Sequence, residues 1–115
     1  MDKLIVKVDK NYRLEKYIFV FLPDGTKLPR QTDLSISDNT YGKALTVKFQ
    51  YGPAFEDNKI EFKKGKYYFD GVLIPHQNRV KKPVVSKPFL SSLDFVESNI
   101  PYFIGQFSCT DFDLA

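Results

Sequence analysis

An eight-residue pattern occurs twice in this chain, and it constrains the fold more than any other feature of the sequence. Residues 24–31, with the sequence DGTKLPRQ, return 46 positions later as residues 70–77, DGVLIPHQ. In both copies an aromatic, apolar run precedes the Asp-Gly pair, and Asp-Gly between apolar runs is the strongest short-range signal of a β-hairpin. The Pro then ends the short second strand, because Pro donates no hydrogen bond to a sheet. The pattern therefore predicts two similar hairpins, and it describes architecture rather than chemistry.

Two origins of this repeat are compatible with the sequence. The similarity extends upstream, where residues 13–15 (RLE) align with residues 59–61 (KIE), and downstream only at Leu34 and Val80. A duplication within one fold would explain the shared Pro-x-Gln ending. Convergence would explain the Asp-Gly turns alone, since such turns are common between apolar runs. Both explanations stay open on the sequence alone.

Alternation of apolar and polar residues divides the chain into short strands. The segments that it indicates are residues 4–8, 16–22, 34–37, 44–51, 59–63, 66–70, 72–74 and 80–85, and only residues 91–98 look helical. We therefore expect an all-β fold, or β with one short helix. It would be a small antiparallel barrel of OB-like or Greek-key type, or alternatively a small β-sandwich. The 115 residues suit a single β-rich domain over residues 1–105, followed by residues 106–115 as an acidic, aromatic C-terminal tail or a terminal strand.

Little in the sequence could carry catalysis. The single His, His76, lies at the end of a predicted strand, and the single Cys, Cys109, has no basic neighbour that would lower its pKa. No motif for nucleophilic catalysis, phosphate binding or metal-dependent hydrolysis occurs. One His and one Cys cannot form a structural zinc site. We therefore expect a protein that is not an enzyme and that holds no metal and no cofactor.

The single Cys also bears on the compartment. It allows no intramolecular disulfide, which suits a reducing environment. Charges interrupt the N-terminal apolar residues, as a signal peptide would not allow. No apolar run approaches the roughly 20 residues that cross a bilayer. The expected location is the cytoplasm, without membrane association.

Positive charge is concentrated in the middle of the chain. Residues 41–90 carry ten basic and four acidic groups, whereas residues 91–115 carry four acidic groups and no basic one. Proteins that bind single-stranded nucleic acid combine cations that follow the backbone with aromatic rings that stack on bases. Strands 44–51, 59–63 and 66–70 would form such a surface if they were neighbours. The candidate nucleic-acid contacts are Lys48, Lys63, Lys64, Lys66, Tyr68, Arg79, Lys81 and Lys82. The alternative is that these lysines line strand faces and edges, where they block aggregation.

The acidic end of the chain places two carboxylates around an aromatic ring, at Asp111, Phe112 and Asp113. In organisation the chain resembles single-stranded DNA-binding proteins, in which a basic barrel precedes an acidic tail that bears an aromatic residue. The resemblance implies that these three residues recruit a protein partner and compete with DNA for the basic groove. The alternative is a terminal strand that packs its aromatic residues on the domain.

Two functions therefore compete. The leading hypothesis is a non-catalytic protein that binds single-stranded nucleic acid, with DNA and RNA both open. The alternative is a protein–protein interaction or structural assembly component, for example a small phage or bacterial structural or inhibitory protein. Such a protein would self-associate as a homo-oligomer or dock on a partner through exposed strands.

Overall fold

The computed structural model describes residues 2–9, 17–53, 55, 59–86 and 102–115, and these residues form ten β-strands and no helix. The helix expected at residues 91–98 lies outside the described residues. The strands are β1 (Leu4–Val8), β2 (Ile18–Phe21), β3 (Gln31–Asn39), β4 (Gly42–Tyr51), β5 (Ile60–Lys63), β6 (Lys66–Phe69), β7 (Val72–Leu73), β8 (Arg79–Ser86), β9 (Tyr102–Cys109) and β10 (Phe112–Leu114). The predicted all-β fold is confirmed.

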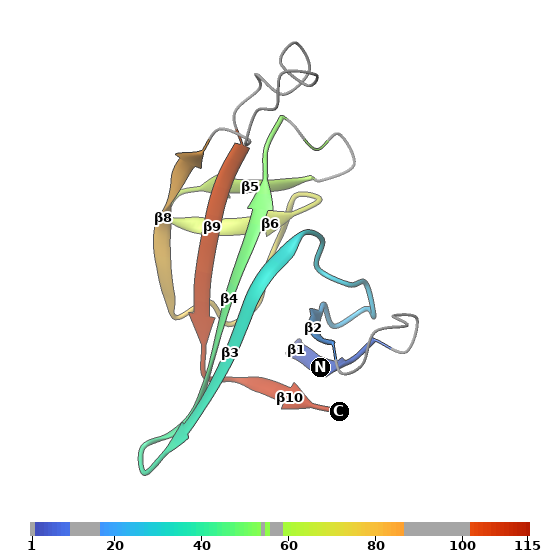
Figure 1. The fold of residues 1–115 in the computed structure, drawn as a ribbon, viewed down its shortest axis with the longest axis vertical. Coiled ribbons are helices and arrows are strands. Elements are labelled where there is room, and N and C mark those ends of the chain that lie inside the picture. Colours follow the sequence, from blue (N-terminus) through green and yellow to red (C-terminus); the bar gives the residue numbers. More distant parts are fainter. Residues whose placement is uncertain (1, 10–16, 54, 56–58, 87–101) are drawn as a thin grey trace, which may run out of the picture.

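The strands form three sheets. The longest has the order β3-β4-β9-β8, and the two smaller sheets have the orders β10-β1-β2 and β5-β6-β7. Figure 1 shows β5 and β6 crossing behind β9 and β4 at a steep angle, as in a sandwich of packed sheets. In the described part of the chain the sheets do not close into a barrel, so the sandwich alternative fits better than the barrel. Nor are the sheets wholly antiparallel, because β10 pairs with β1 in parallel.

One face of the long sheet forms the core. On β4 Leu45, Val47 and Phe49 are fully inaccessible to solvent, and Tyr51 is 5% exposed. The ring of Tyr67 from β6 meets Phe49 edge-on at a centroid distance of 5.0 Å. Opposite them on β9 stands Gly105, where an added Cβ would lie 2.7 Å from the Phe49 ring. Gly105 is therefore what allows the two rings to occupy the centre of the core.

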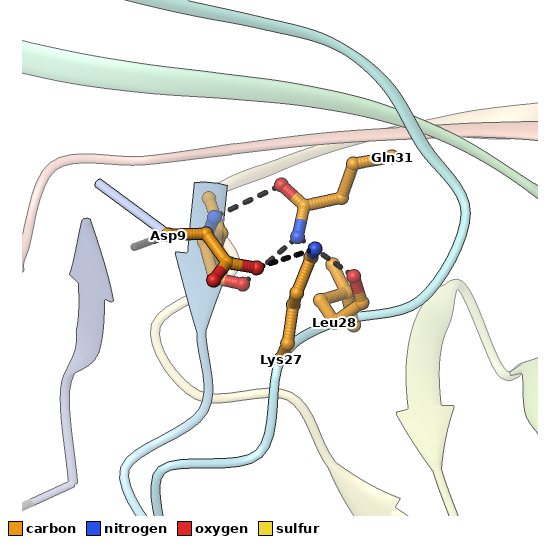
Figure 2. A network of polar contacts seen from close by, with 5 residues as sticks. Asp9, Lys27, Leu28 and Gln31 are labelled. Atoms are coloured by element: carbon orange, nitrogen blue, oxygen red, sulfur yellow. Dashed lines mark hydrogen bonds and ion pairs between the residues drawn. The ribbon is translucent and has the colours of Figure 1, made fainter. Parts of the chain in front are cut away.

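Both copies of the repeat build the same hydrogen-bonded unit around their Gln. Gln31 Oε1 accepts from Val20 N at 2.9 Å, and its Nε2 donates to Val20 O at 2.9 Å and to Leu28 O at 2.7 Å. Figure 2 shows this amide beside β2, next to the ion pair between Lys27 and Asp9. The Gln side chain thus extends the pairing of β2, because it bonds Val20 N and also Val20 O, which accepts from Leu28 N at 3.1 Å as well.

The second Gln makes the same contacts in the other hairpin. Gln77 Oε1 accepts from Tyr67 N at 3.0 Å, and its Nε2 donates to Tyr67 O at 2.8 Å and to Ile74 O at 2.7 Å. The residue before each Gln has a positive φ, 57° at Arg30 and 61° at His76. Pro followed by a positive φ is the requirement of a type II turn, which aims each Gln back at its own hairpin.

The two hairpins differ by one residue in the turn. Asp70 and Gly71 have φ values of 51° and 78°, as the two-residue type I′ turn requires. The first hairpin has three turn residues, Pro23, Asp24 and Gly25, with a φ of 93° at Gly25. That is the arrangement of a type I turn with a G1 bulge. The offset of 46 therefore holds from the Asp-Gly pair onward, whereas the equivalent strand residues before the turn, Val20 and Tyr67, are 67 − 20 = 47 positions apart.

The repeat extends to the topology of strands β1 to β9. Strands β1 to β4 correspond to β5, β6, β8 and β9, and residues 27–28 take the place of β7. Leu34 pairs with Val47 in the first unit, and Val80 pairs with Phe107 in the second. Val47 and Phe107 in turn pair with each other at the centre of the long sheet. A pseudo-two-fold axis therefore passes through this pair and relates two units of one topology.

The C-terminal segment belongs to this framework. Gln106 to Cys109 form the second half of β9, and β10 adds to the outer edge of β1. Phe112 is only 3% exposed and faces Leu4 in the register of the two strands. In the structure the last residues of the chain thus contribute to two strands, the end of β9 and β10.

Candidate functional site

In the described part of the chain no sheet packs on the second face of the long sheet, and most of its side chains are polar or charged. Alternation along the strands places Lys48 of β4 and Arg79 and Lys81 of β8 on this open face, opposite the buried positions. The register forms two rows across the sheet, Asp33–Lys48–Gln106–Lys81 and Ser35–Thr46–Ser108–Arg79. Three of the predicted contacts therefore share one surface.

Three further predicted lysines come from the β5–β6 hairpin, which reaches the start of β8. Lys63 and Lys66 flank the turn, and Lys64 lies within it with a φ of 52°. Lys66 Nζ donates to Gln77 O at 2.9 Å, which places this turn beside the beginning of β8. Lys82 is exposed in the bulge that separates Lys81 from Val84 on the same strand. The β8 edge therefore gathers cations from both sheets.

Few carboxylates neutralise this group. Lys63 forms an ion pair with Glu61 at 3.2 Å, and its Nζ lies 5.7 Å from the centroid of the Tyr68 ring. Among the described residues, Lys48, Arg79 and Lys81 take part in no ion pair. Their charge is therefore available to an anionic ligand.

The strand arrangement that motivated the basic surface does not occur. Strands 59–63 and 66–70 are neighbours, but strand 44–51 pairs with β3 and β9 instead. Lys48 and Tyr68 consequently lie in different sheets. Tyr68 is half-buried on the outer face of its sheet, while Tyr51 and Tyr67 are core residues at 5% and 0% exposure. Of the tyrosines in the basic middle, Tyr68 and the fully exposed Tyr41 present accessible rings.

The predicted partner-binding residues at the C-terminus are held by the fold. Asp111 pairs with Lys3 at 3.1 Å and lies 3.5 Å from His76 Nδ1. The Phe112 ring is covered by Lys43, whose Nζ lies 4.9 Å from its centroid. Asp113 is exposed. A partner would therefore meet carboxylates here, while the aromatic ring is already packed.

The two side chains with reactive potential, Cys109 and His76, differ in burial. Cys109 is fully buried, and burial raises the pKa of its thiol to about 11, so it is protonated at neutral pH. His76 is at the surface, paired with Asp111. The described residues contain no group of three or more metal-ligating side chains.

Sequence reasoning missed a cavity at the lower end of the open face. It has a volume of about 380 Å³ and lies between the β3–β4 hairpin and the ends of β8 and β9. Its lining includes Tyr41, Thr46, Asn78, Arg79, Ser108 and Thr110. Only the turn around Tyr41 was visible in the sequence, because the other residues meet through strand pairing.

Comparison with protein-family models, with curated proteins and with solved structures finds no significant match. The part of the chain that the structure describes contains no helix with the length and apolarity needed to span a membrane.

Proposed function

We propose that this protein binds single-stranded nucleic acid without catalysis, through the open face of the long sheet and the β8 edge. The proposal rests on the gathering of Lys48, Arg79 and Lys81 on one face, where none of the three forms an ion pair with a described residue. Asp33 lies next to Lys48 in the register and is the one carboxylate in the two rows. The lysines of the β5–β6 turn extend the same positive surface. Cations at strand spacing suit a flexible, single-stranded backbone, which can follow them.

Binding would be electrostatic and therefore sensitive to salt. Each phosphate neutralised on a single strand releases counterions, and the slope of log K against log salt is about −0.7 per phosphate. Fluorescence anisotropy with a labelled oligonucleotide at about 50 and 200 mM salt measures this slope. An absence of binding at micromolar protein in low salt would refute the proposal.

A matched pair of variants separates this surface from net charge. Lys48→Gln with Lys81→Gln removes two charges from the open face. Lys7→Gln with Lys59→Gln removes two charges from β1 and from the chain next to β5. We expect the first pair to weaken binding about tenfold and to reduce the salt slope, and the second pair to change it less than threefold. Equal effects of both pairs would mean that only the total charge matters.

The β3 edge supports a second candidate function, self-association through a strand. The two edges of the long sheet differ: β8 carries lysines, Pro83 and a bulge, which block strand addition, whereas β3 has neither Lys nor Pro. Asn39 and Gly42 flank a two-residue turn, so the outward backbone groups of β3 belong to Leu34, Ile36 and Asp38. An antiparallel pair of β3 strands centred on Ser35 would place Leu34 opposite Ile36 of the other copy.

Light scattering tests this second candidate. A dimer that persists in high salt and dissociates in Ile36→Lys would support it. Val84→Lys on the guarded edge is the matched control, because Val84 is also exposed, at 66%. A wild-type monomer at high micromolar concentration would exclude it.

A further inference from the structure

We propose that the cavity between the β3–β4 hairpin and the ends of β8 and β9 binds one nucleotide unit, with its phosphate at Arg79 and its base on Tyr41. This inference rests on the proposed function and deepens it, because it names one subsite and the parts of the ligand that it holds. The cavity volume of about 380 Å³ falls within the range of small-molecule sites.

Charge distinguishes this cavity from two others in the described part of the chain. A cavity of about 530 Å³ is lined by Glu61 and Asp70, and one of about 520 Å³ is lined by Asp33. The lining of the 380 Å³ cavity contains Arg79 and no carboxylate. Arg79 forms no ion pair with a described residue. A phosphate would therefore meet an unopposed guanidinium, whose fork of N–H donors suits phosphate oxygens.

The hydroxyl groups in the cavity add donors for the same anion. Thr46 Oγ1 and Ser108 Oγ lie 3.0 Å apart, so one donates to the other and one hydroxyl hydrogen is left over. Asn78 Nδ2 donates to Thr110 Oγ1 at 2.7 Å, and the Thr110 hydroxyl hydrogen is left free by that bond. Two hydroxyl hydrogens and a guanidinium in one carboxylate-free cavity are the chemistry of a phosphate site.

Tyr41 supplies a surface for the base at the rim of this cavity. Tyr41 is 98% exposed, the largest exposure among the large hydrophobic residues described. The bond from Tyr41 N to Asn39 Oδ1, at 2.9 Å, fixes the turn that carries it. An exposed ring on an ordered turn can stack on a base with little further ordering. A nucleotide with its phosphate at Arg79 and its base at Tyr41 would use both features.

Titrations followed by amide chemical shifts test the two halves of the subsite separately. The probes are inorganic phosphate, a nucleoside and a nucleoside 5′-monophosphate, each added to the full chain. We expect phosphate to move the amides of Asn78, Arg79, Ser108 and Thr110, and the monophosphate to move Tyr41 as well. Arg79→Gln should weaken the binding of both phosphate and the monophosphate about tenfold. Tyr41→Ala should weaken the binding of the monophosphate alone, also about tenfold. Lys59→Gln, which removes a charge elsewhere, should change neither, and Ser108→Ala should weaken both without unfolding the sheet.

The outcomes separate the subsite from the proposed function. If a labelled oligonucleotide binds but phosphate and monophosphate move no lining amide at tens of millimolar, the subsite is wrong and the proposed function stands. The same conclusion follows if Arg79→Gln and Lys59→Gln weaken the monophosphate equally. If no oligonucleotide binds at low salt, the proposed function fails, whatever the small probes do. Shifts that follow the expected pattern, and respond to both variants as stated, support the subsite.

Discussion

At the scale of single residues, the two glutamines that end the repeat do the most to hold the fold. Each amide accepts from the N–H of a strand residue, Val20 or Tyr67, and donates to the C=O of that residue and to one further carbonyl. The same C=O groups also accept from Leu28 N and Ile74 N. Gln77 is only 6% exposed, whereas Gln31 is half-buried. Loss of a buried partner leaves backbone groups unsatisfied, and this penalty grows with burial.

We therefore expect Gln77→Ala to be more destabilising than Gln31→Ala. The first should lower the free energy of unfolding by about 3 kcal/mol and the second by about 1–2 kcal/mol, because water can reach the groups that Gln31 serves. Gln106→Ala is the control, since its side chain lies on the open face. Urea denaturation measures all three. Equal effects at Gln77 and Gln106 would contradict the structural role of the repeat.

At the scale of elements, the extra turn residue of the first hairpin can be removed. Leu22 N donates to Thr26 O at 2.7 Å across the turn, and Gly25 N donates to Leu22 O at 2.9 Å. Deletion of Pro23 leaves Asp24 and Gly25 as a two-residue loop, like Asp70 and Gly71 in the second hairpin. We expect this deletion to change the stability by less than about 1 kcal/mol, since Asp-Gly suits a type I′ turn.

The matched deletion lies in the other hairpin. Without Asp70 a single residue would have to close the loop between the paired residues Phe69 and Val72. That deletion should destabilise the protein strongly or prevent folding. Thermal denaturation compares the two deletion variants. Similar losses of stability in both would mean that the first turn has no dispensable residue.

A second prediction at this scale concerns β10. Removal of residues 112–115 takes away the parallel partner of β1 and the buried ring of Phe112. We expect a loss of roughly 3 kcal/mol in the free energy of unfolding, comparable to the deletion of a buried aromatic side chain. Asp113→Asn, which keeps the strand, should have almost no effect. A truncated protein as stable as the full chain would mean that residues 112–115 are a free acidic tail rather than a packed strand.

The elements also show which parts of the fold and of the candidate site could be predicted from the sequence. The hairpins were predictable because Asp-Gly turns act locally, and the strands because alternation is local too. The partners of Gln77 were not, since the amide reaches back 10 residues to Tyr67. Alternation placed Lys48 on a strand face but could not show that β4 pairs with β9 rather than with β5, because alternation carries no information on strand order. The cavity around Arg79 was hidden for the same reason.

At the scale of the whole molecule, the two units share the turn before the Gln, the hydrogen bonds of the Gln amide and the strand topology. Asp-Gly turns could arise twice independently, but convergence would not by itself reproduce the type II turn, the three amide hydrogen bonds and the pairing order. The correspondence therefore favours duplication over convergence. Within this correspondence the edge strands β3 and β8 have the same place in the sheet but opposite charge. The β8 edge is cationic and carries features that block strand addition, whereas the β3 edge has neither Lys nor Pro.

The core that the two units enclose should make the protein sensitive to alkali. Burial raises the pKa of Tyr51, Tyr67 and Cys109, the last to about 11. A raised pKa means that the folded state keeps its proton where the unfolded state has lost it. Stability is therefore complete below the unfolded pKa, near 8.5 for Cys and 10 for Tyr, and falls as pH rises toward the folded values. We expect the free energy of unfolding in urea to be constant from about pH 7 to 8 and to decline above about pH 9.

Replacement of the thiol shows which group starts this decline. In Cys109→Ala the early part of the alkaline loss should disappear, so that stability begins to fall only near pH 10, where tyrosines of the unfolded chain ionise. Tyr51→Phe should reduce the later part and leave the onset near pH 9 unchanged, because it removes an ionisable hydroxyl and keeps the ring that packs on Phe49 and Phe103. Both variants will shift the absolute stability at pH 7, so the quantity to compare is the change between pH 7 and 11. Profiles of identical shape in the wild type and both variants would mean that other groups govern the alkaline transition.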